Sequence, residues 1–180
     1  PGTTDADSAL REHECFWART SGTAATRNTT ASQPGFNSSG YQYAMGGKVM
    51  LSPGCIAGGS ASLAENFTDV QNLAHEKSDN LSAGLVVKHE DGDWLFAGAV
   101  NVQYGWNDLT RSVAFPLPST NATSSPNQFF LDGRVRTAYL GSSGDFYFKP
   151  WVAADIYYSD VSGTHEKGAG ALGLIVNSAN

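Results

Sequence analysis

The sequence predicts an all-β protein, an antiparallel up-and-down transmembrane β-barrel. Three observations support this fold class: period-two alternation of apolar and polar residues, unusually long strand segments, and connections that are alternately long and short. Barrels of bacterial outer membranes have short turns at one end and long loops at the other, which produces this alternation. The connections are tight turns at 52–54, 91–93 and 142–145, and polar stretches at 23–40, 65–80, 107–127 and 159–168.

The composition excludes several classes of protein. The 180 residues suit one domain, and 41% of them are hydrophobic, which is compatible with a barrel that has a wet interior. No stretch approaches the ~20 consecutive apolar residues of a spanning helix, so a membrane would be crossed by strands of ~9–11 residues each. The net charge is −6 and no basic stripe is present, so we expect no nucleic-acid partner.

Segment 94–107 is the clearest strand. One face carries aromatic residues at both ends, Trp94 and Trp106, with Val100 and its neighbours between them. This order is typical of a strand whose outer face meets two membrane interfaces with hydrocarbon between. The segment is also much longer than the ~5–6 residues of a typical soluble strand.

The same alternation predicts eight strands in all. Segment 55–64 consists mostly of small residues, which would leave room inside a barrel lumen. Pro150 lies within segment 146–158, where it costs one ladder hydrogen bond near a turn. The predicted strands are 15–22, 41–52, 55–64, 81–90, 94–107, 129–140, 146–158 and 170–178.

The two faces of these strands predict two environments. Polar and charged side chains are expected to line the lumen, where charges of both signs can pair and hold the wall in shape. Aromatic side chains of the other face are expected to meet lipid. The lumen-facing set is Arg19, Lys48, Lys88, Asn101, Gln103, Arg134, Arg136, Lys149 and Asp155; the lipid-facing aromatic set is Tyr41, Tyr43, Trp94, Phe96, Tyr104, Trp106, Phe129, Tyr139, Phe146, Phe148 and Tyr158.

No sequence motif indicates catalysis or metal binding. His13, His75, His89 and His165 lack the spacing of metal ligands, and no Gly-x-Ser-x-Gly motif frames a serine nucleophile. We therefore expect no enzymatic activity, no metal and no cofactor.

The two cysteines, Cys15 and Cys55, begin predicted strands that are two places apart. Such strands are separated by about 9–10 Å at ~4.8 Å per strand. A disulfide requires Cα atoms within ~7 Å, so a bond would need the strand ends to fray. Free thiols are the expected state.

Five segments resemble the translocator domain of type V autotransporters. The first strand of that family contains a Trp-Ala-Arg-like sequence, and a glycine-rich second strand follows a variable loop. The matching order and spacing extend across roughly residues 15–176. The segments are 15–22 (CFWARTSG), 40–48 (GYQYAMGGK), 131–139 (LDGRVRTAY), 146–151 (FYFKPW) and 166–174 (EKGAGALGL).

The resemblance implies a twelve-stranded barrel in the bacterial outer membrane that carries its own N-terminal passenger across that membrane. It implies a linker through the lumen, frequently helical, and recognition by the barrel-assembly machinery. Residues 1–14 are then the linker or the end of a lumen helix, and residues 15–180 are the barrel domain. Arg134 and Arg136, two apart on one face, are the best candidates to contact the linker or an acidic neighbour.

The chain departs from the family in two ways. Only eight strands can be counted, and residues 176–180 (VNSAN) lack the terminal aromatic residue of the family's last strand. The expectation is therefore the first eight strands of a longer barrel. Two alternatives stay open: a complete small eight-stranded outer-membrane barrel, and a soluble β-sandwich that serves as a binding or adhesin domain.

Overall fold

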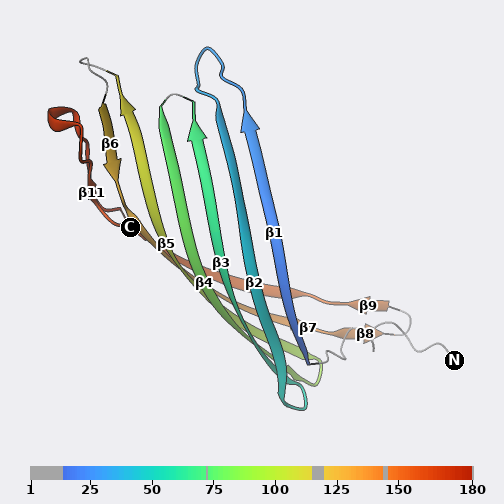
Figure 1. Cartoon of the computed structure of the whole chain (residues 1–180). Helices are drawn as coiled ribbons and strands as arrows, with labels where there is room; N and C mark the ends of the chain where they lie inside the picture. The colour runs from blue at the N-terminus through green and yellow to red at the C-terminus, as the bar shows by residue number, and fades with distance from the viewer. Residues whose placement is uncertain (1–13, 72, 115–119, 144–145, 180) are drawn as a thin grey trace.

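A computed structural model of the chain describes residues 14–71, 73–114, 120–143 and 146–179. Long, curved strands form one antiparallel sheet, as the sequence predicts (Figure 1). The long strands are β1 (Cys15–Arg27), β2 (Phe36–Ser52), β3 (Cys55–Val70), β4 (Ala74–Asp91), β5 (Trp94–Val113), β7 (Asn127–Tyr139) and β10 (Trp151–Val161); the short ones are β6 (Thr120–Ser124), β8 (Gly141–Ser143), β9 (Phe146–Phe148), β11 (Thr164–His165) and β12 (Ile175–Val176).

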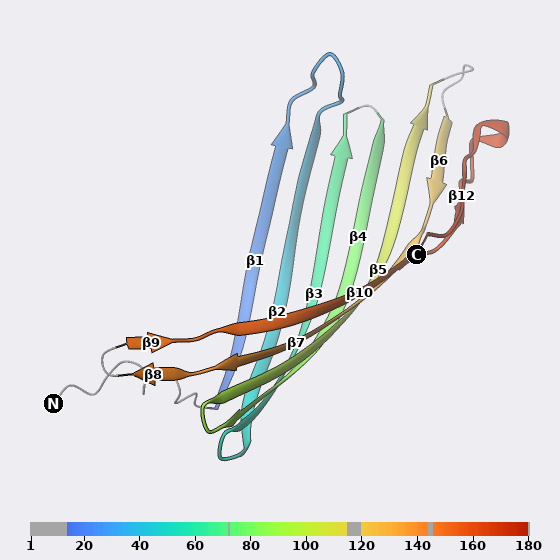
Figure 2. The ribbon, with the colours of Figure 1, turned by 180° about the vertical axis from the view of Figure 1, so that it is seen from behind.

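The strands follow one another across the sheet in chain order. The path is β1-β2-β3-β4-β5-β7-β10, and β6 pairs with the far end of β5 (Figure 2). β6 and β7 together form one interrupted neighbour of β5, since β7 covers Trp94–Trp106 and β6 covers Leu109–Val113. The interruption lies at Pro126, whose carbonyl accepts hydrogen bonds from both the backbone and the side-chain amide of Asn107. The predicted up-and-down topology is confirmed.

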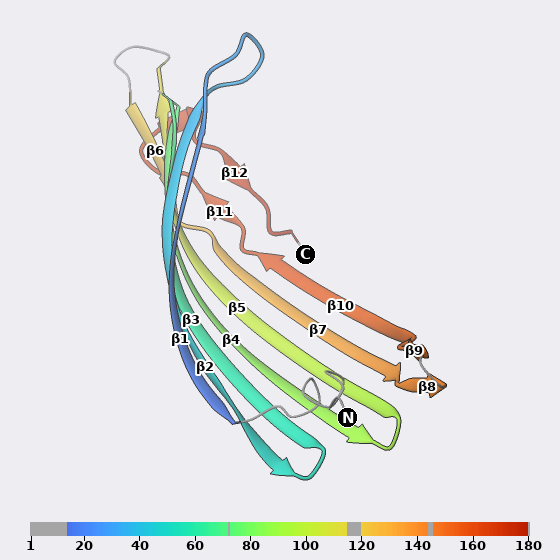
Figure 3. The same cartoon turned by 90° about the vertical axis from the view of Figure 1, so that its right-hand side faces the viewer.

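The sheet is strongly curved and open. Figure 3 shows it curling toward one side, with the ribbon of β11 and β12 on its hollow side. Within the described residues, β1 and β10 do not pair with each other, so the structure does not show a closed eight-stranded barrel. All of the long strands belong to one sheet, and the two facing sheets of a sandwich are not present in this part of the chain.

The prediction that residues 65–80 form a long loop is wrong. β3 continues to Val70 and β4 begins at Ala74, so the connection is only 71–73. The ladder persists because backbone pairing does not require apolar side chains, and polar side chains pair across it. Lys77 Nζ lies 2.8 Å from Glu65 Oε1 and 3.3 Å from Asp79 Oδ2. The polar stretches 23–40 and 107–127 likewise contribute their outer parts to strands β1, β2, β5, β6 and β7.

Predicted strand 146–158 is broken at Lys149 and Pro150. β9 leaves the main sheet and pairs with β8 in a separate ribbon, and the wall strand β10 begins at Trp151. Pro150 cannot donate a ladder hydrogen bond. Its carbonyl accepts one from the Tyr139 amide at 3.0 Å, which anchors the start of β10 beside β7.

Predicted strand 170–178 is not a wall strand. It contains the 3₁₀ turn η1 (Gly170–Leu172) and β12, which pairs with β11. Gly168 and Gly170 have φ values of 92° and 56°, in the left-handed region that glycine tolerates and other residues avoid. These two glycines turn the chain back on itself, so the segment cannot continue as an extended strand.

The predicted linker at 1–14 lies outside the described residues except for Glu14. Glu14 Oε1 accepts a hydrogen bond from the Met50 amide at 3.2 Å, which places the entry of the chain at the turn end of β2. Among the described residues, no helix is long and apolar enough to span a membrane.

The described residues contain almost no conventional hydrophobic core. The buried apolar residues are small: Val113, Ala122, Ala138 and Ala169. Large apolar side chains are instead exposed along the sheet, and the functional question is what covers them.

Candidate functional site

The register of the strands divides the sheet into two faces, because residues directly opposite one another in a ladder point to the same side. Starting from Val100 on β5, the ladders place Leu85, Gly133 and Ile156 on one face. We call this the apolar face. Starting from Asn101, the ladders place Gly84, Asp132 and Tyr157 on the other, which we call the polar face.

The apolar face has an uncharged band of membrane-like height. On β5 this face carries no Asp, Glu, Lys or Arg between Trp94 and Trp106, a wholly described stretch. Trp94 and Tyr104 are ten residues apart, about 33 Å along a strand. With the ~40° tilt of barrel strands this becomes about 25 Å of height, the size of the lipid-facing band of outer-membrane barrels.

Aromatic rings gather at both borders of this band. At the long-connection end, Tyr41 and Tyr43 lie 5.8 Å apart, and Tyr104 and Trp106 lie 4.8 Å apart, between ring centroids. At the turn end, Trp94 contacts Phe96 at 6.2 Å and Tyr139 at 5.1 Å. Charges begin immediately beyond the first border, where the Tyr41 hydroxyl donates to Glu65. Two girdles around an uncharged band match the pattern of interfacial aromatic residues in membrane proteins.

The predicted lipid-facing aromatic residues fall on the apolar face with two exceptions. Phe146 and Phe148 lie on the separate β8–β9 ribbon, where Phe148 contacts Tyr139 at 6.1 Å. Contact with lipid stays a prediction for all of them. The residues on the apolar face are Tyr41, Tyr43, Trp94, Phe96, Tyr104, Trp106, Phe129, Tyr139 and Tyr158.

In this sheet the apolar side chains are more exposed than the polar ones, the reverse of a sheet in a soluble protein. Leu85, Val135 and Ile156 on the apolar face are 66%, 63% and 73% exposed. Gln42 and Gln103 on the polar face are half-buried, and the sheet curls toward that side (Figure 3). An exposed apolar surface of this extent is unfavourable in water and requires a cover.

Amide and hydroxyl groups form a ladder across the polar face. Gln42 Nε2 donates to Ser62 Oγ at 3.1 Å, and the hydroxyls of Ser62 and Ser82 lie 2.7 Å apart. Gln103 Nε2 continues the ladder to Asn80 Oδ1 at 3.2 Å. The sequence prediction included Gln103 and omitted the others. Their signal is the alternation of Ser and Asn at 78, 80 and 82, which matches the lumen-facing period of a strand.

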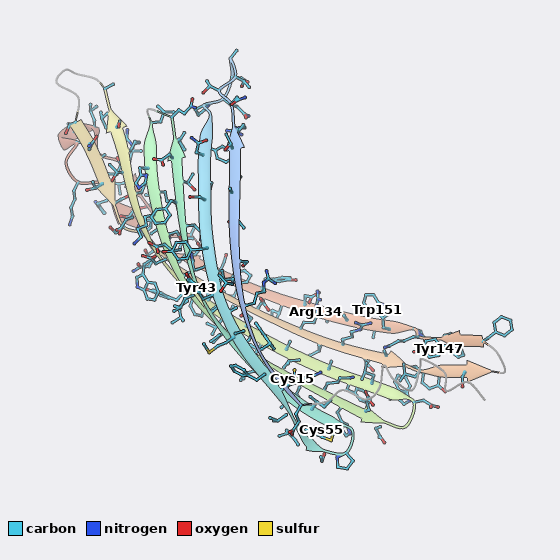
Figure 4. The ribbon with its side chains drawn as sticks, turned by 45° about the vertical axis from the view of Figure 1, so that its right-hand side comes forward. Cys15, Tyr43, Cys55, Arg134, Tyr147 and Trp151 are labelled. Atoms are coloured by element: carbon cyan, nitrogen blue, oxygen red, sulfur yellow. The ribbon has the colours of Figure 1, made fainter. Side chains whose placement is uncertain are left out.

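Toward the turn end of the polar face, charged side chains pair with one another or stack on an aromatic ring. Arg134, labelled in Figure 4, lies on β7. It donates to Asp155 directly across the β7–β10 ladder, with Nε–Oδ1 and Nη2–Oδ2 distances of 2.5 and 3.2 Å. The Arg136 guanidinium lies 4.7 Å above the Trp151 ring. Lys88 Nζ lies 2.9 Å from Glu90.

The predicted lumen-facing residues therefore share the polar face, with one exception. Lys149 lies between β9 and β10, outside any ladder, so the register does not assign it to a face. Whether this face lines a lumen stays a prediction. The residues on it are Arg19, Lys48, Lys88, Asn101, Gln103, Arg134, Arg136 and Asp155.

Trp17 also lies on the polar face, opposite Gly46 in the ladder. A Cβ atom on Gly46 would lie 2.7 Å from the Trp17 ring, so only glycine fits beneath the indole. Gly58, Ser60 and Gly84 continue this lane of small residues across β3 and β4. The small residues of segment 55–64 thus leave space on the polar face, and Trp17 occupies part of it.

A clasp joins the 162–179 segment to the far end of β5. Arg111 Nε and Nη2 donate to the two carboxylate oxygens of Glu166 at 2.9 and 2.5 Å. The Leu174 amide donates to Glu166 Oε2 at 2.9 Å, and only 5% of the Glu166 side chain is exposed. The Arg111 guanidinium and the Leu174 amide hold the pKa of Glu166 well below its usual range, at about 2.

The pKa of Glu166 gives the clasp a defined pH range. A depressed carboxylate pKa stabilises the folded state above the unfolded value of 4.5 and loses this contribution as the pH falls through about 2. We expect the 162–179 segment to stay attached to β5 at pH 5 and to loosen below about pH 3.

In the E166Q variant the Leu174 amide should exchange its hydrogen faster already at pH 7, as measured by hydrogen exchange. E90Q, which alters the turn end, should leave Leu174 unchanged; equal exchange in E166Q and the wild type would contradict the clasp.

Neither a cluster of metal ligands nor a disulfide occurs in the part of the chain that the structure describes. Among the described residues, no group of three His, Cys, Asp or Glu side chains could hold a metal ion. Cys15 and Cys55 are both free. Their ladder positions are opposite Lys48 and His89, which places them on different faces of the sheet.

The geometry defines the class of protein: the sheet has the architecture of a transmembrane β-barrel wall. The chain belongs to the autotransporter family, because residues 16–180 match the model of the Autotransporter beta-domain. Membership in that family indicates a bacterial outer-membrane barrel of type V secretion systems. The sequence-based recognition of this family is confirmed.

A solved structure supports the fold. The translocator domain of the autotransporter NalP from Neisseria meningitidis matches with a TM-score of 0.70 and 16% identity, over 96% of this chain and 60% of that one. This chain therefore spans about 60% of the length of that domain. The beta domain of the Bordetella autotransporter Brka matches at a TM-score of 0.36 and 11% identity, over 93% and 95% of the chains. That weaker likeness carries no weight, and no curated protein sequence matches significantly.

Proposed function

We propose that this chain forms part of the wall of an outer-membrane translocator that supports secretion of its own N-terminal passenger through the lumen. The observation that carries the proposal is the inverted sheet, with its exposed apolar band on one face and hydrogen-bonded polar side chains on the other. Residues 15–180 form the barrel domain, and residues 1–14 form the linker or the end of a lumen helix.

The physical basis is the requirement of a bilayer for satisfied backbone groups. In hydrocarbon each unpaired N–H or C=O costs several kcal/mol, so a strand can cross only within a closed ladder. β2 to β5 are paired on both sides over most of their length. Further strands of the family's barrel would complete the ladder at β1 and β10, and the barrel-assembly machinery is the expected partner for insertion.

The polar face supports the role of a passage for a peptide. Its central part carries neutral amides and hydroxyls, and its turn end carries Lys48, Lys88, Arg134 and Arg136. The linker segment 5–14 (DADSALREHE) has four carboxylates and one arginine. These four cations outnumber the three carboxylates of the same region, Glu90, Asp132 and Asp155, so its net charge is positive and complements an acidic linker. The proposed role is transport, with no catalysis and no cofactor.

Tryptophan quenching by brominated phospholipids tests which face meets lipid. In a variant that keeps only Trp94, and in one that keeps only Trp106, fluorescence should be strongly quenched in brominated bilayers, because both indoles lie on the apolar face. A matched variant that keeps only Trp17 should stay bright, since Trp17 lies on the polar face. Equal quenching of Trp17 and Trp94, or no quenching of either, would overturn the proposal.

A further inference from the structure

A furrow runs along the apolar face between the side chains of β4, β7 and β10. It consists of two adjoining hollows that share Val87, Gly98, Val135 and Ala154. Its floor is Gly98, where a Cβ atom would meet no other atom within 4 Å. Gly46 is a contrasting case, since a Cβ there would clash with a ring and a carbonyl. The space above Gly98 is therefore open and lined almost entirely by aliphatic side chains.

The furrow begins at the turn-side aromatic girdle and points toward the middle of the band. It extends from the Phe96–Thr137 pair to the Val100–Gly133 pair, four residues along β5. Four residues span about 13 Å along the strand, or about 10 Å of depth at the ~40° tilt of barrel strands, which lies within the ~15 Å that one leaflet contributes to a ~30 Å hydrocarbon core. The furrow is continuous with the exposed apolar face, so the molecule that covers that face also fills it.

Among the apolar-face residues that line the furrow, the polar ones are Thr137 and His89, and both lie at its girdle end. The Thr137 hydroxyl is buried and has no hydrogen-bond partner, and His89 lies on the opposite side of Phe96, two strands away. A buried hydroxyl without a partner costs free energy. A rotation of about 120° around χ1 moves the hydroxyl to another staggered position, and Thr137 is one of the residues that line the furrow. At this depth, just inside the Trp94 girdle, the acceptors of a bilayer are ester carbonyls.

We infer that the furrow is a binding site for one phospholipid of the turn-side leaflet. One acyl chain lies over Gly98, between Val87 and Val135. Thr137 donates a hydrogen bond to the ester carbonyl of that chain, at the end of the furrow next to the turn-side girdle. The inference rests on the proposed function, because it requires the apolar face to meet lipid. It adds a specific site of long residence to the general contact between wall and bilayer.

Native mass spectrometry of the full chain, extracted from bilayers of phosphatidylethanolamine and phosphatidylglycerol, tests the site. We expect one retained phospholipid on the wild type after mild delipidation. G98L, which fills the furrow, should abolish retention, and T137V should reduce it several-fold without lowering stability. A83L adds the same side chain to the same face, on β4 outside the furrow, and should retain the lipid.

Two outcomes would overturn the site. One is equal retention by G98L, A83L and the wild type; the other is no retained phospholipid on any of them. Quenching of Trp94 by brominated lipid separates these failures from failure of the proposed function. If Trp94 is quenched and G98L retains as much lipid as the wild type, only the phospholipid site in the furrow is rejected. If Trp94 is not quenched, both the site and the proposed function are rejected.

Discussion

The V100R variant is expected to lose about 2–4 kcal/mol of stability in a bilayer, the cost of an arginine on the lipid face at the midplane. Val100 lies near the middle of the uncharged band that extends from Trp94 to Tyr104 on β5. Its side chain is 44% exposed on the apolar face, next to Leu85 and Gly133 in the ladder. A guanidinium there has no partner and must either desolvate or draw water into the hydrocarbon.

The control for V100R is N101R, one residue further along the same strand. Asn101 lies on the polar face, where its amide donates to Asp132 at 3.4 Å, so an arginine at this position faces a carboxylate. N101R should change stability by less than about 0.5 kcal/mol. Urea titration of the bilayer-inserted chain, followed by tryptophan fluorescence, measures both variants. Equal losses in V100R and N101R would mean that the two faces do not occupy different environments.

The period-two pattern was sufficient to predict the central part of the sheet. In segment 94–107 the sequence separates Val100 from Asn101, and the ladders place these residues on opposite faces. The pattern is informative there because lipid and water impose opposite demands on consecutive side chains. The predicted face membership of Arg134 and Asp155 follows from the same period.

The pattern could not predict where the strands end. Segments 65–70 and 74–80 carry polar residues at nearly every position, which the sequence analysis interpreted as loop. They are strands, because a hairpin ladder extends beyond the membrane as long as polar cross-strand pairs such as Lys77–Glu65 satisfy the side chains. Loss of alternation therefore marks the end of the apolar band and not the end of pairing.

The period-two pattern also could not predict contacts between segments that are distant in the sequence. Arg111 and Glu166 are 55 residues apart, and nothing local to either residue indicates their pairing. Trp17 was missed because an indole beside a Trp-Ala-Arg-like motif has no signal that fixes its face until the register with Gly46 is known. The glycines at 168 and 170 did contain a signal, since positive φ values are the common reason for glycine at a turn.

Secretion should fall several-fold in the double variant R134A/R136A, while insertion of the barrel stays near the wild-type level. The two side chains lie on the polar face near the turn end, where the chain enters beside β2 through the contact of Glu14 with Met50. Arg134 already pairs with Asp155, and Arg136 stacks on Trp151. A guanidinium has five N–H donors, and Arg134 uses two of them toward Asp155, so further donors remain on a side chain that is 59% exposed. We expect those donors to hold the acidic linker.

Surface display of a reporter passenger measures secretion, and heat-modifiable migration of the folded barrel measures insertion. R134K/R136K keeps both charges and should restore most of the display, which a purely structural role of the planar guanidinium groups would not allow. D155A removes the wall partner of Arg134 without removing positive charge, and display should stay at the wild-type level or rise. Unchanged display in R134A/R136A would exclude these arginines as a linker contact, and loss of insertion in parallel with display would show that they act by holding β7 to β10.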